Sequence, residues 1–341
     1  MQFLLSGSTL QTRTSAKLLM AHVKTVFGGY PIGPGKYFPD EKTIEKVYQL
    51  LEEGGCNTID TACLYGNSEE WLGNTGAGKR FTIDSKAPGG GIPGSSTSVT
   101  IPQLAKESVD RLGTTMDVYY LHVPDSSVEL EDQLKGINEA YKAGYFKRFG
   151  LSNYKAADVQ RVYDICTEKG YPLPAVYQGN YSAVARRQEA ELVPTLRKLG
   201  IAFYVYSPIA GGLLTKTSEQ MRAANADAGR FAKGDALEGL YGAMYSKPSY
   251  YKALDLWAEA AEEAGCSKAE LAYRWVAFDS VVDAKYGDAI IFGASKLSQI
   301  SETLAWMKRG SVGGGGQGED RGDLEGGRAR SAAGQLPQVI K

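Results

Sequence analysis

Short apolar segments alternate eight times with longer amphipathic segments along this 341-residue sequence. This alternation predicts an α/β protein, because parallel strands joined by helical crossovers produce it. Eight such units within roughly 290 residues favour a closed (β/α)8 TIM barrel, and an open doubly wound sheet is the alternative. In either fold, reactive side chains are expected where a strand gives way to the following loop.

The eight expected strands are the short apolar segments. They cover residues 23–29, 56–62, 81–87, 116–123, 146–152, 173–181, 201–207 and 288–295. In the first helical segment, residues 40–54, apolar side chains such as Ile44 and Val47 recur at helical spacing. Gly54 and Gly55 then indicate a C-terminal cap.

Amphipathic segments follow the other strands in the same way. They cover residues 68–74, 101–113, 130–144, 156–170, 189–200, 250–265, 268–278 and 296–310. A long insertion separates the seventh strand from the helices that follow it, so this unit of the barrel is expected to be larger than the others.

The two ends of the chain differ from the barrel segment, which we place at residues 22–310. Residues 1–21 carry their charges after the short apolar stretch, which excludes a secretory signal. They are rich in Ser and Thr and precede the first acidic residue, Asp40, as in mitochondrial transit peptides. We favour a loose leader in a cytoplasmic protein. Residues 311–341 are predicted to be a disordered tail, because this glycine-rich stretch cannot bury enough surface to offset its ordering entropy.

Composition excludes several classes of function. The formal net charge of -1 provides no field to attract nucleic acid or an anionic membrane. No apolar run approaches the ~20 residues that span a bilayer. The 4 cysteines fit neither a zinc pattern nor a disulfide framework, which indicates reduced thiols, and the 2 histidines are too few for a histidine-rich metal site. The oligomeric state is left open, with a homodimer as one alternative.

Two glycine-rich stretches resemble nucleotide-binding motifs without their structural context. Residues 73–80, GNTGAGKR, nearly match a phosphate-binding P-loop, but Arg80 stands where Ser or Thr should hold magnesium. The stretch also precedes a strand, whereas a P-loop follows one. Residues 89–94, GGGIPG, match the dinucleotide fingerprint formally, but Pro93 and the Ser/Thr run after it do not open a helix. We interpret this second stretch as a flexible loop.

Four ionisable residues fall at the ends of three neighbouring strands. Asp60 closes the second strand, Tyr65 follows in its loop, Lys86 closes the third strand and His122 closes the fourth. Each alone has an ordinary structural interpretation, such as a turn residue, a packed aromatic or a surface charge. Their coincidence on one rim of a barrel instead indicates a catalytic site.

These residue types suggest proton donation. Tyrosine normally has a pKa near 10, and a nearby lysine ammonium such as that of Lys86 favours the tyrosinate and lowers that pKa. A buried lysine needs a carboxylate such as Asp60 to keep its charge, and His122 can orient a substrate oxygen by hydrogen bonding. Such a site would protonate a carbonyl oxygen through Tyr65. No side chain donates hydride, so a cofactor is required.

Around these residues the sequence resembles the aldo-keto reductase superfamily. DTACLYGNSEE carries Asp60 and Tyr65, IDSKAP carries Lys86, and YYLHVPD carries His122, matching the four members of its catalytic tetrad. The runs GLSNYKAADV, LPAVYQGNYSAVARRQE, YSPIAGGLLTK and GDAIIFGASKLSQI are most similar to the aflatoxin aldehyde reductase group and its fungal relatives. The resemblance implies a barrel that binds NADPH in extended form and reduces small-molecule carbonyl substrates.

The resemblance also implies which residues would hold NADPH. Ser152 and Asn153 would hold the nicotinamide amide with Gln178 beside them, and Tyr206 would stack on the nicotinamide ring. The residues expected to cover the pyrophosphate are Ser207, Gly211, Gly212, Leu213 and Lys216. Those expected at the adenosine 2′-phosphate are Gly293, Ser295, Lys296 and Gln299, with Arg230 also facing the cofactor. A helix start near Ser295 and the charge of Lys296 suit a phosphate, which favours NADPH over NADH.

On the substrate side, Tyr245 would line the pocket with His122, and Tyr30 would shape its mouth. Two departures from the family pattern stand out. Thr303 occupies a place where an asparagine is common, and glycine-rich sequence replaces the segment that usually closes over the substrate. A cofactor-binding regulatory or non-catalytic barrel subunit therefore stays open as an alternative, as does a biosynthetic reductase for a single metabolite. The sequence does not name the substrate.

Overall fold

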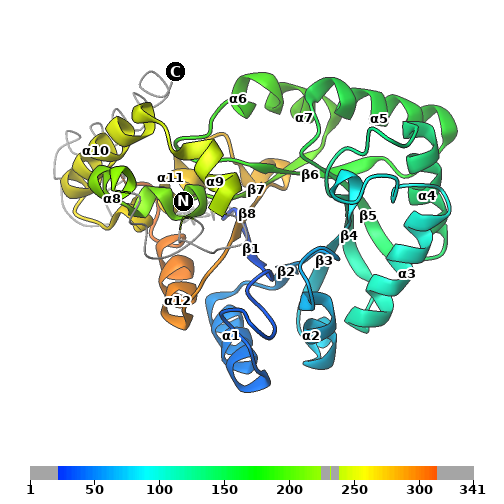
Figure 1. Cartoon of the computed structure of the whole chain (residues 1–341), viewed down its shortest axis with the longest axis horizontal. Coiled ribbons are helices and arrows are strands. Elements are labelled where there is room, and N and C mark those ends of the chain that lie inside the picture. Colours follow the sequence, from blue (N-terminus) through cyan, green and yellow to red (C-terminus); the bar gives the residue numbers. More distant parts are fainter. Residues whose placement is uncertain (1–21, 224–230, 232–237, 313–341) are drawn as a thin grey trace, which may run out of the picture.

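The computed structural model describes residues 22–223, 231 and 238–312 (Figure 1). Eight parallel strands close into a barrel in chain order, with β1 hydrogen-bonded to β8, which confirms the (β/α)8 prediction and rules out an open sheet. The strands are β1 (Lys24–Gly28), β2 (Thr58–Asp60), β3 (Thr82–Ala87), β4 (Met116–Leu121), β5 (Phe146–Ser152), β6 (Pro174–Asn180), β7 (Ala202–Tyr206) and β8 (Ala289–Phe292).

Helices surround the ring of strands (Figure 1). Those of the first six units are α1 (Glu41–Gly54), α2 (Ser68–Asn74), α3 (Thr100–Leu112), α4 (Leu130–Lys142), α5 (Ala156–Lys169), α6 (Gln188–Glu191) and α7 (Val193–Leu199). The single helix expected at 189–200 is thus two helices, because the backbone leaves the helical region at Leu192, two residues before Pro194. Gly55, at a φ of 76°, caps α1 as expected.

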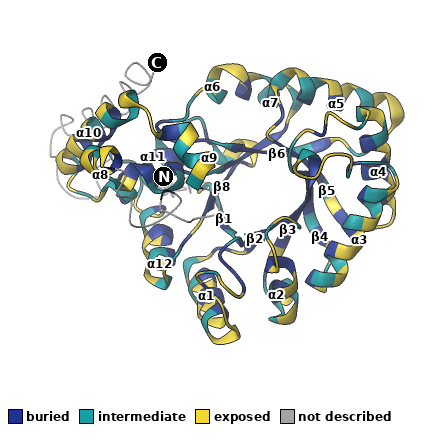
Figure 2. Cartoon of the chain, in the orientation of Figure 1, coloured by how far each residue is buried: buried dark blue, intermediate teal, exposed yellow. Residues whose placement is uncertain are grey.

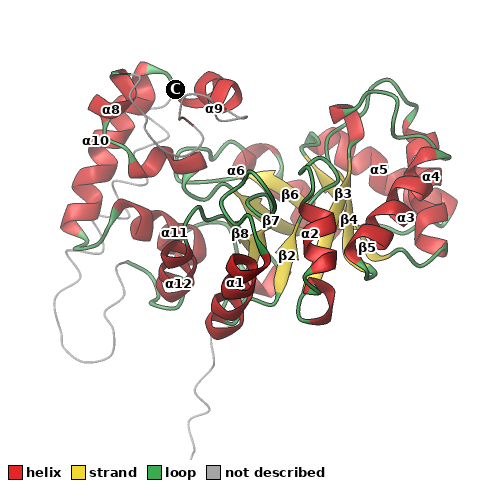
Figure 3. Ribbon diagram, turned by 60° about the horizontal axis from the view of Figure 1, so that its bottom comes forward, coloured by secondary structure: helices red, strands yellow, loops and turns green. Residues whose placement is uncertain are grey.

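The long insertion after β7 contributes helices of its own. They are α8 (Ser218–Arg222) and α9 (Glu238–Tyr245), followed by α10 (Pro248–Glu263) and α11 (Lys268–Phe278), while α12 (Leu297–Trp306) follows β8. Figure 3 shows α8, α9 and α10 gathered on one side of the barrel. None of the helices in the described part of the chain is both long and apolar enough to cross a membrane. The leader and the tail predicted at the two ends lie outside the described residues, except for residues 311 and 312.

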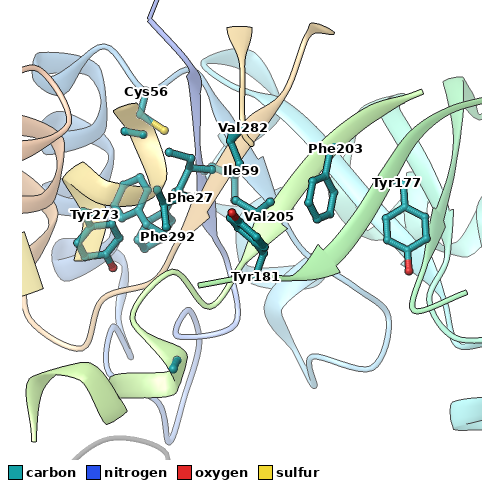
Figure 4. Close-up of a cluster of buried hydrophobic side chains, with 14 of the residues drawn as sticks. Phe27, Cys56, Ile59, Tyr177, Tyr181, Phe203, Val205, Tyr273, Val282 and Phe292 are labelled. Atoms are coloured by element: carbon teal, nitrogen blue, oxygen red, sulfur yellow. The ribbon is translucent and has the colours of Figure 1, made fainter. Parts of the chain in front are cut away.

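Two apolar layers hold the barrel together. The larger one lies between strands and helices, where Figure 2 shows the inner helix faces buried. Figure 4 shows part of it, including Phe27 and Phe292, whose ring centroids are 5.5 Å apart on paired strands. The smaller layer fills the barrel interior around Tyr120. Gly150 leaves the room for that ring, because a Cβ at this position would collide with it.

A buried ion pair links α7 to the segment that enters β8. Arg197 donates to both carboxylate oxygens of Asp288, at 2.8 and 2.6 Å. The same carboxylate accepts the backbone N–H groups of Phe203 (2.8 Å) and Asp283 (2.9 Å), and its side chain is fully buried. One carboxylate therefore satisfies donors from three segments of the chain.

Replacing Asp288 with alanine should lower the free energy of unfolding by about 3–5 kcal/mol, because a largely buried guanidinium loses its ion-pair partner and two N–H groups lose their acceptor. Denaturant unfolding would measure this loss. Asp110→Ala is the control, since the Asp110–Lys106 pair is more than half exposed on both sides and its removal should cost less than about 1 kcal/mol. Equal losses in the two variants would contradict the role given to Asp288.

Candidate active site

The four ionisable residues expected on one rim do converge at the carboxyl ends of β2, β3 and β4. Lys86 is fully buried and donates to Asp60 Oδ2 and to the carbonyl of Thr61, both at 2.6 Å. Its ammonium lies 5.2 Å from the centroid of the Tyr65 ring, and that ring meets the His122 ring edge-on at 5.8 Å. The barrel therefore brings an acid, a cation, a carboxylate and an imidazole into one site.

The ion pair at the centre of this site is shielded from water. Burying a charge is costly unless it is paired and hydrogen-bonded. Asp60 Oδ2 binds Lys86, and its other oxygen accepts a hydrogen bond from Gln178 Nε2 at 2.9 Å across the barrel. The amide of Gln178, expected beside a nicotinamide, thus also holds the carboxylate in place.

His122 is a neutral imidazole at physiological pH. Burial first, and then the ammonium of Lys86, lower the pKa of His122 from 6.5 to about 3. Its Nδ1 is buried without a hydrogen-bond partner among the described residues. A neutral ring keeps one N–H donor, which suits it to hydrogen-bonding a substrate oxygen without adding a second cation beside Lys86.

The loop that carries Tyr65 is fixed by contacts that the sequence did not indicate. Lys36 Nζ donates to the carbonyl of Tyr65 at 2.6 Å and lies 4.4 Å from the Tyr30 ring centroid. The Tyr30 ring in turn meets the Tyr65 ring edge-on at 5.4 Å, so Tyr30 does lie beside the site. Buried hydroxyls tie the loop ends, because Thr61 donates to Ser68 and Ser68 donates to the carbonyl of Gly29, both at 2.8 Å.

Residues expected around a nicotinamide are adjacent in the structure. Asn153 Nδ2 donates to the carbonyl of His122 and to Ser152 Oγ, both at 3.0 Å, and Asn153 Oδ1 accepts from the Tyr206 hydroxyl at 2.9 Å. In the described part of the chain, the non-glycine residues with left-handed backbones are Asn153, Ser207 and Ala210, and all follow β5 or β7. Such strain often marks a functional surface.

The segment after β7 has the features of a cradle for a phosphate group. Gly211 and Gly212 adopt φ values of 67° and 100°, and a Cβ at Gly212 would meet no atom within 4 Å. Gly211 instead lies against the Tyr241 ring, where a Cβ would collide. The open backbone at Gly212 lets an anionic group approach closely, so this position fits a pyrophosphate. Leu213 is fully buried, so it packs beneath this segment and does not face a bound anion as expected, whereas Lys216 is half-buried.

The start of α12 holds the remaining cofactor candidates. Gln299 Oε1 accepts the N–H groups of Ser295 (2.8 Å) and Lys296 (3.2 Å), so the side chain of Gln299 caps the turn. Gly293 and Lys296 are exposed beside it. A phosphate would therefore meet the Lys296 ammonium and the next N–H groups of the helix start, whereas those of residues 295 and 296 already have an acceptor.

The structure treats differently the two remaining residues, Arg230, expected to face the cofactor, and Tyr245, expected to line the substrate pocket. Arg230 lies outside the described residues. Tyr245 is only 1% exposed, and its hydroxyl accepts a hydrogen bond from Asn180 Nδ2 at 3.0 Å. The structure thus places Tyr245 against the end of β6, within a cluster of aromatic rings that includes Tyr250.

A second buried carboxyl, that of Asp84, lies inside the barrel, and no pattern in the sequence indicates it. It is fully buried, and its Oδ1 accepts the Val118 N–H at 3.1 Å. Burial first, and then the charge of Asp60, raise the pKa of Asp84 from 3.8 to about 7. The burial of Asp84 follows only from its place inside the barrel, because an aspartate within a strand of the sequence is equally compatible with an exposed position.

Comparison with known proteins relates the whole barrel to one family. The model of the aldo/keto reductase family matches residues 24–310. The oxidoreductase sirO of Leptosphaeria maculans is 36% identical over 84% of this chain and 87% of its own length. Human aldo-keto reductase family 7 member A3 and human aflatoxin B1 aldehyde reductase member 4 are each 34% identical, over 87% of this chain and 92% of their own lengths.

Asp84→Asn should stabilise the protein at and above neutral pH. The folded-state pKa of Asp84 lies above its ordinary value of 3.8, so the folded protein binds this proton more tightly than the unfolded chain. Wild-type stability relative to the variant should fall as pH rises from about 4 to about 7, by an amount on the order of 4 kcal/mol. Urea unfolding at several pH values measures the difference. A difference that stays constant over this window would contradict the assignment.

Proposed function

This chain belongs to the aldo/keto reductase family, and from that premise we propose that it reduces aldehydes or ketones to alcohols with NADPH and uses Tyr65 as the proton donor. The observation that carries the proposal is the buried Lys86–Asp60 pair beneath the Tyr65 ring. The relatives named for aflatoxin B1 aldehyde reductase support an aldehyde as one substrate class.

The proposed proton transfer follows from this arrangement. Tyr65 gives its hydroxyl proton to the carbonyl oxygen and becomes a phenolate. The Lys86 ammonium, 5.2 Å from the ring centroid, stabilises that negative charge, and Asp60 keeps the ammonium charged and in place. When bound, the nicotinamide cofactor supplies the hydride that the carbonyl carbon accepts.

His122 orients the substrate in this proposal. Its ring stands against the Tyr65 ring and is neutral, so its N–H can hydrogen-bond the same carbonyl oxygen that receives the proton. The backbone of the following loop is held by Asn153, which donates to the His122 carbonyl. One hydrogen bond therefore joins His122, which orients the substrate in this proposal, to Asn153, which is expected at the nicotinamide.

Tyr65→Phe should abolish carbonyl reduction, lowering kcat by about 10²–10⁴-fold, because phenylalanine has no proton to give. The measurement is oxidation of NADPH by the purified protein with a panel of reactive aldehydes and ketones. Tyr37→Phe, which alters a tyrosine that is 45% exposed, is the matched control and should keep full activity.

Turnover retained by Tyr65→Phe would refute the proton-donor role. Tight NADPH binding by the wild type without turnover of any carbonyl in the panel would instead favour a regulatory, cofactor-binding barrel.

Lys296→Ala should raise the KM for NADPH by about tenfold or more and leave the KM for NADH unchanged, because only NADPH carries the 2′-phosphate. Lys308→Ala, an exposed lysine just beyond the other end of α12, is the control. Equal efficiency of the wild type with both cofactors would sink the preference for NADPH.

A further inference from the structure

The floor of the site holds two carboxyl groups but one paired ammonium. Asp60 on β2 and Asp84 on β3 are register partners in adjacent parallel strands. Lys86 stands two residues after Asp84, on the same side of β3, and its ammonium is committed to Asp60 at 2.6 Å. Asp84 has no ion-pair partner among the residues that the structure describes, although it is fully buried.

The hydrogen bonding of Asp84 is incomplete in a way that suits a neutral acid. Its Oδ1 accepts the Val118 N–H, whereas Oδ2 is buried without a partner within the described chain. The hydroxyl of Tyr120 is buried as well and lies beside the Gln178 side chain, and its ring centroid is 5.5 Å from the Lys86 ammonium. Burial raises the pKa of Tyr120 well above its ordinary value, so its hydroxyl stays protonated and adds no negative charge beside Lys86.

Other charged groups facing Asp84 do not neutralise it. On β1, Lys24 acts on it only at a distance, and on β4 the charge of Asp117 opposes its ionisation. Arg148 on β5 is occupied, because it binds Asp117 at 2.7 Å and the Tyr204 hydroxyl of β7 at 3.3 Å. An ionised Asp84 would therefore act mainly on the nearby Asp60–Lys86 pair. Burial and Asp60 together place the pKa of Asp84 near 7, within the range where cells operate.

We propose that Asp84 is a positioning residue for proton transfer at Tyr65. When Asp84 is neutral, Lys86 is paired with Asp60 alone. When Asp84 is ionised, its negative charge offsets part of the positive charge that the Lys86 ammonium presents to Tyr65. Only the O–H bond of the Asp84 carboxyl group breaks and re-forms in this switch, as the group releases a proton to solvent or regains it. With Asp84 neutral, the Lys86 ammonium stabilises the Tyr65 phenolate most strongly. With Asp84 ionised, the added negative charge disfavours the phenolate and makes Tyr65 a weaker acid.

The inference rests on the proposed function of Tyr65, so its test has one readout that needs no turnover. Isotope-labelled tyrosine followed by NMR reports ionisation of Tyr65, whose signal is identified by its absence in Tyr65→Phe. In Asp84→Asn, Tyr65 should ionise at a pH lower by about half a unit or more. Asp117→Asn, which removes a carboxylate at the other end of the barrel strands, should leave the midpoint unchanged. Asp84→Ala repeats the test with a different side chain.

The second readout is the single-turnover rate of NADPH oxidation by a test aldehyde between about pH 6 and about pH 9. The wild-type rate should decline by about threefold or more across neutrality, and the Asp84→Asn rate should stay flat over the same range. Superimposable profiles, or an unchanged Tyr65 midpoint in both Asp84 variants, would overturn the inference. A shifted midpoint in a protein without turnover would uphold the role of Asp84 and refute the proposed reductase activity instead.

Discussion

The buried ion pair of Lys86 with Asp60 is the constraint around which the site is organised. A lysine without exposed surface requires a carboxylate at contact distance, and the pair forms only if β2 and β3 lie in register. Gln178 reaches the same carboxylate from β6, so the pair also depends on barrel closure. The Tyr65 ring lies over the Lys86 ammonium of this pair. The proton donation proposed for Tyr65 therefore depends on the fold and not on the tyrosine alone.

The two ends of the barrel serve different purposes. At the carboxyl ends of the strands the backbone is strained at Asn153, Ser207 and Ala210, and Gly212 borders open space after β7. Near the start of β8, Asp288 satisfies four donors at once and stabilises the fold. Strain is tolerated at one end because the other end and the apolar layers hold the strands in place.

Buried charge is the second theme of the barrel interior. Among the residues that the structure describes, Asp84 has no cation of its own, whereas Asp60 does, and this difference separates two carboxyls that are register partners. The surroundings of Asp84, burial first and then the charge of Asp60, raise the pKa of its carboxyl well above the ordinary value. Lys36 adds a further cation near the mouth of the site, where it holds the Tyr65 loop through a backbone carbonyl.

The sequence by itself determined the number and order of the strand–helix units and the four residues at the ends of β2, β3 and β4. Those features depend on local periodicity, and a strand-end rule then places Asp60, Tyr65, Lys86 and His122 on one rim. Only the tertiary structure decided what depends on distances across the closed barrel. It showed that Gln178 holds Asp60, that Gln299 caps α12 and that Asp84 is buried without a cation from the described part of the chain. The break between α6 and α7 and the contact of Lys36 with Tyr65 also emerged only there, because these contacts join residues whose spacing along the chain carries no periodic signal.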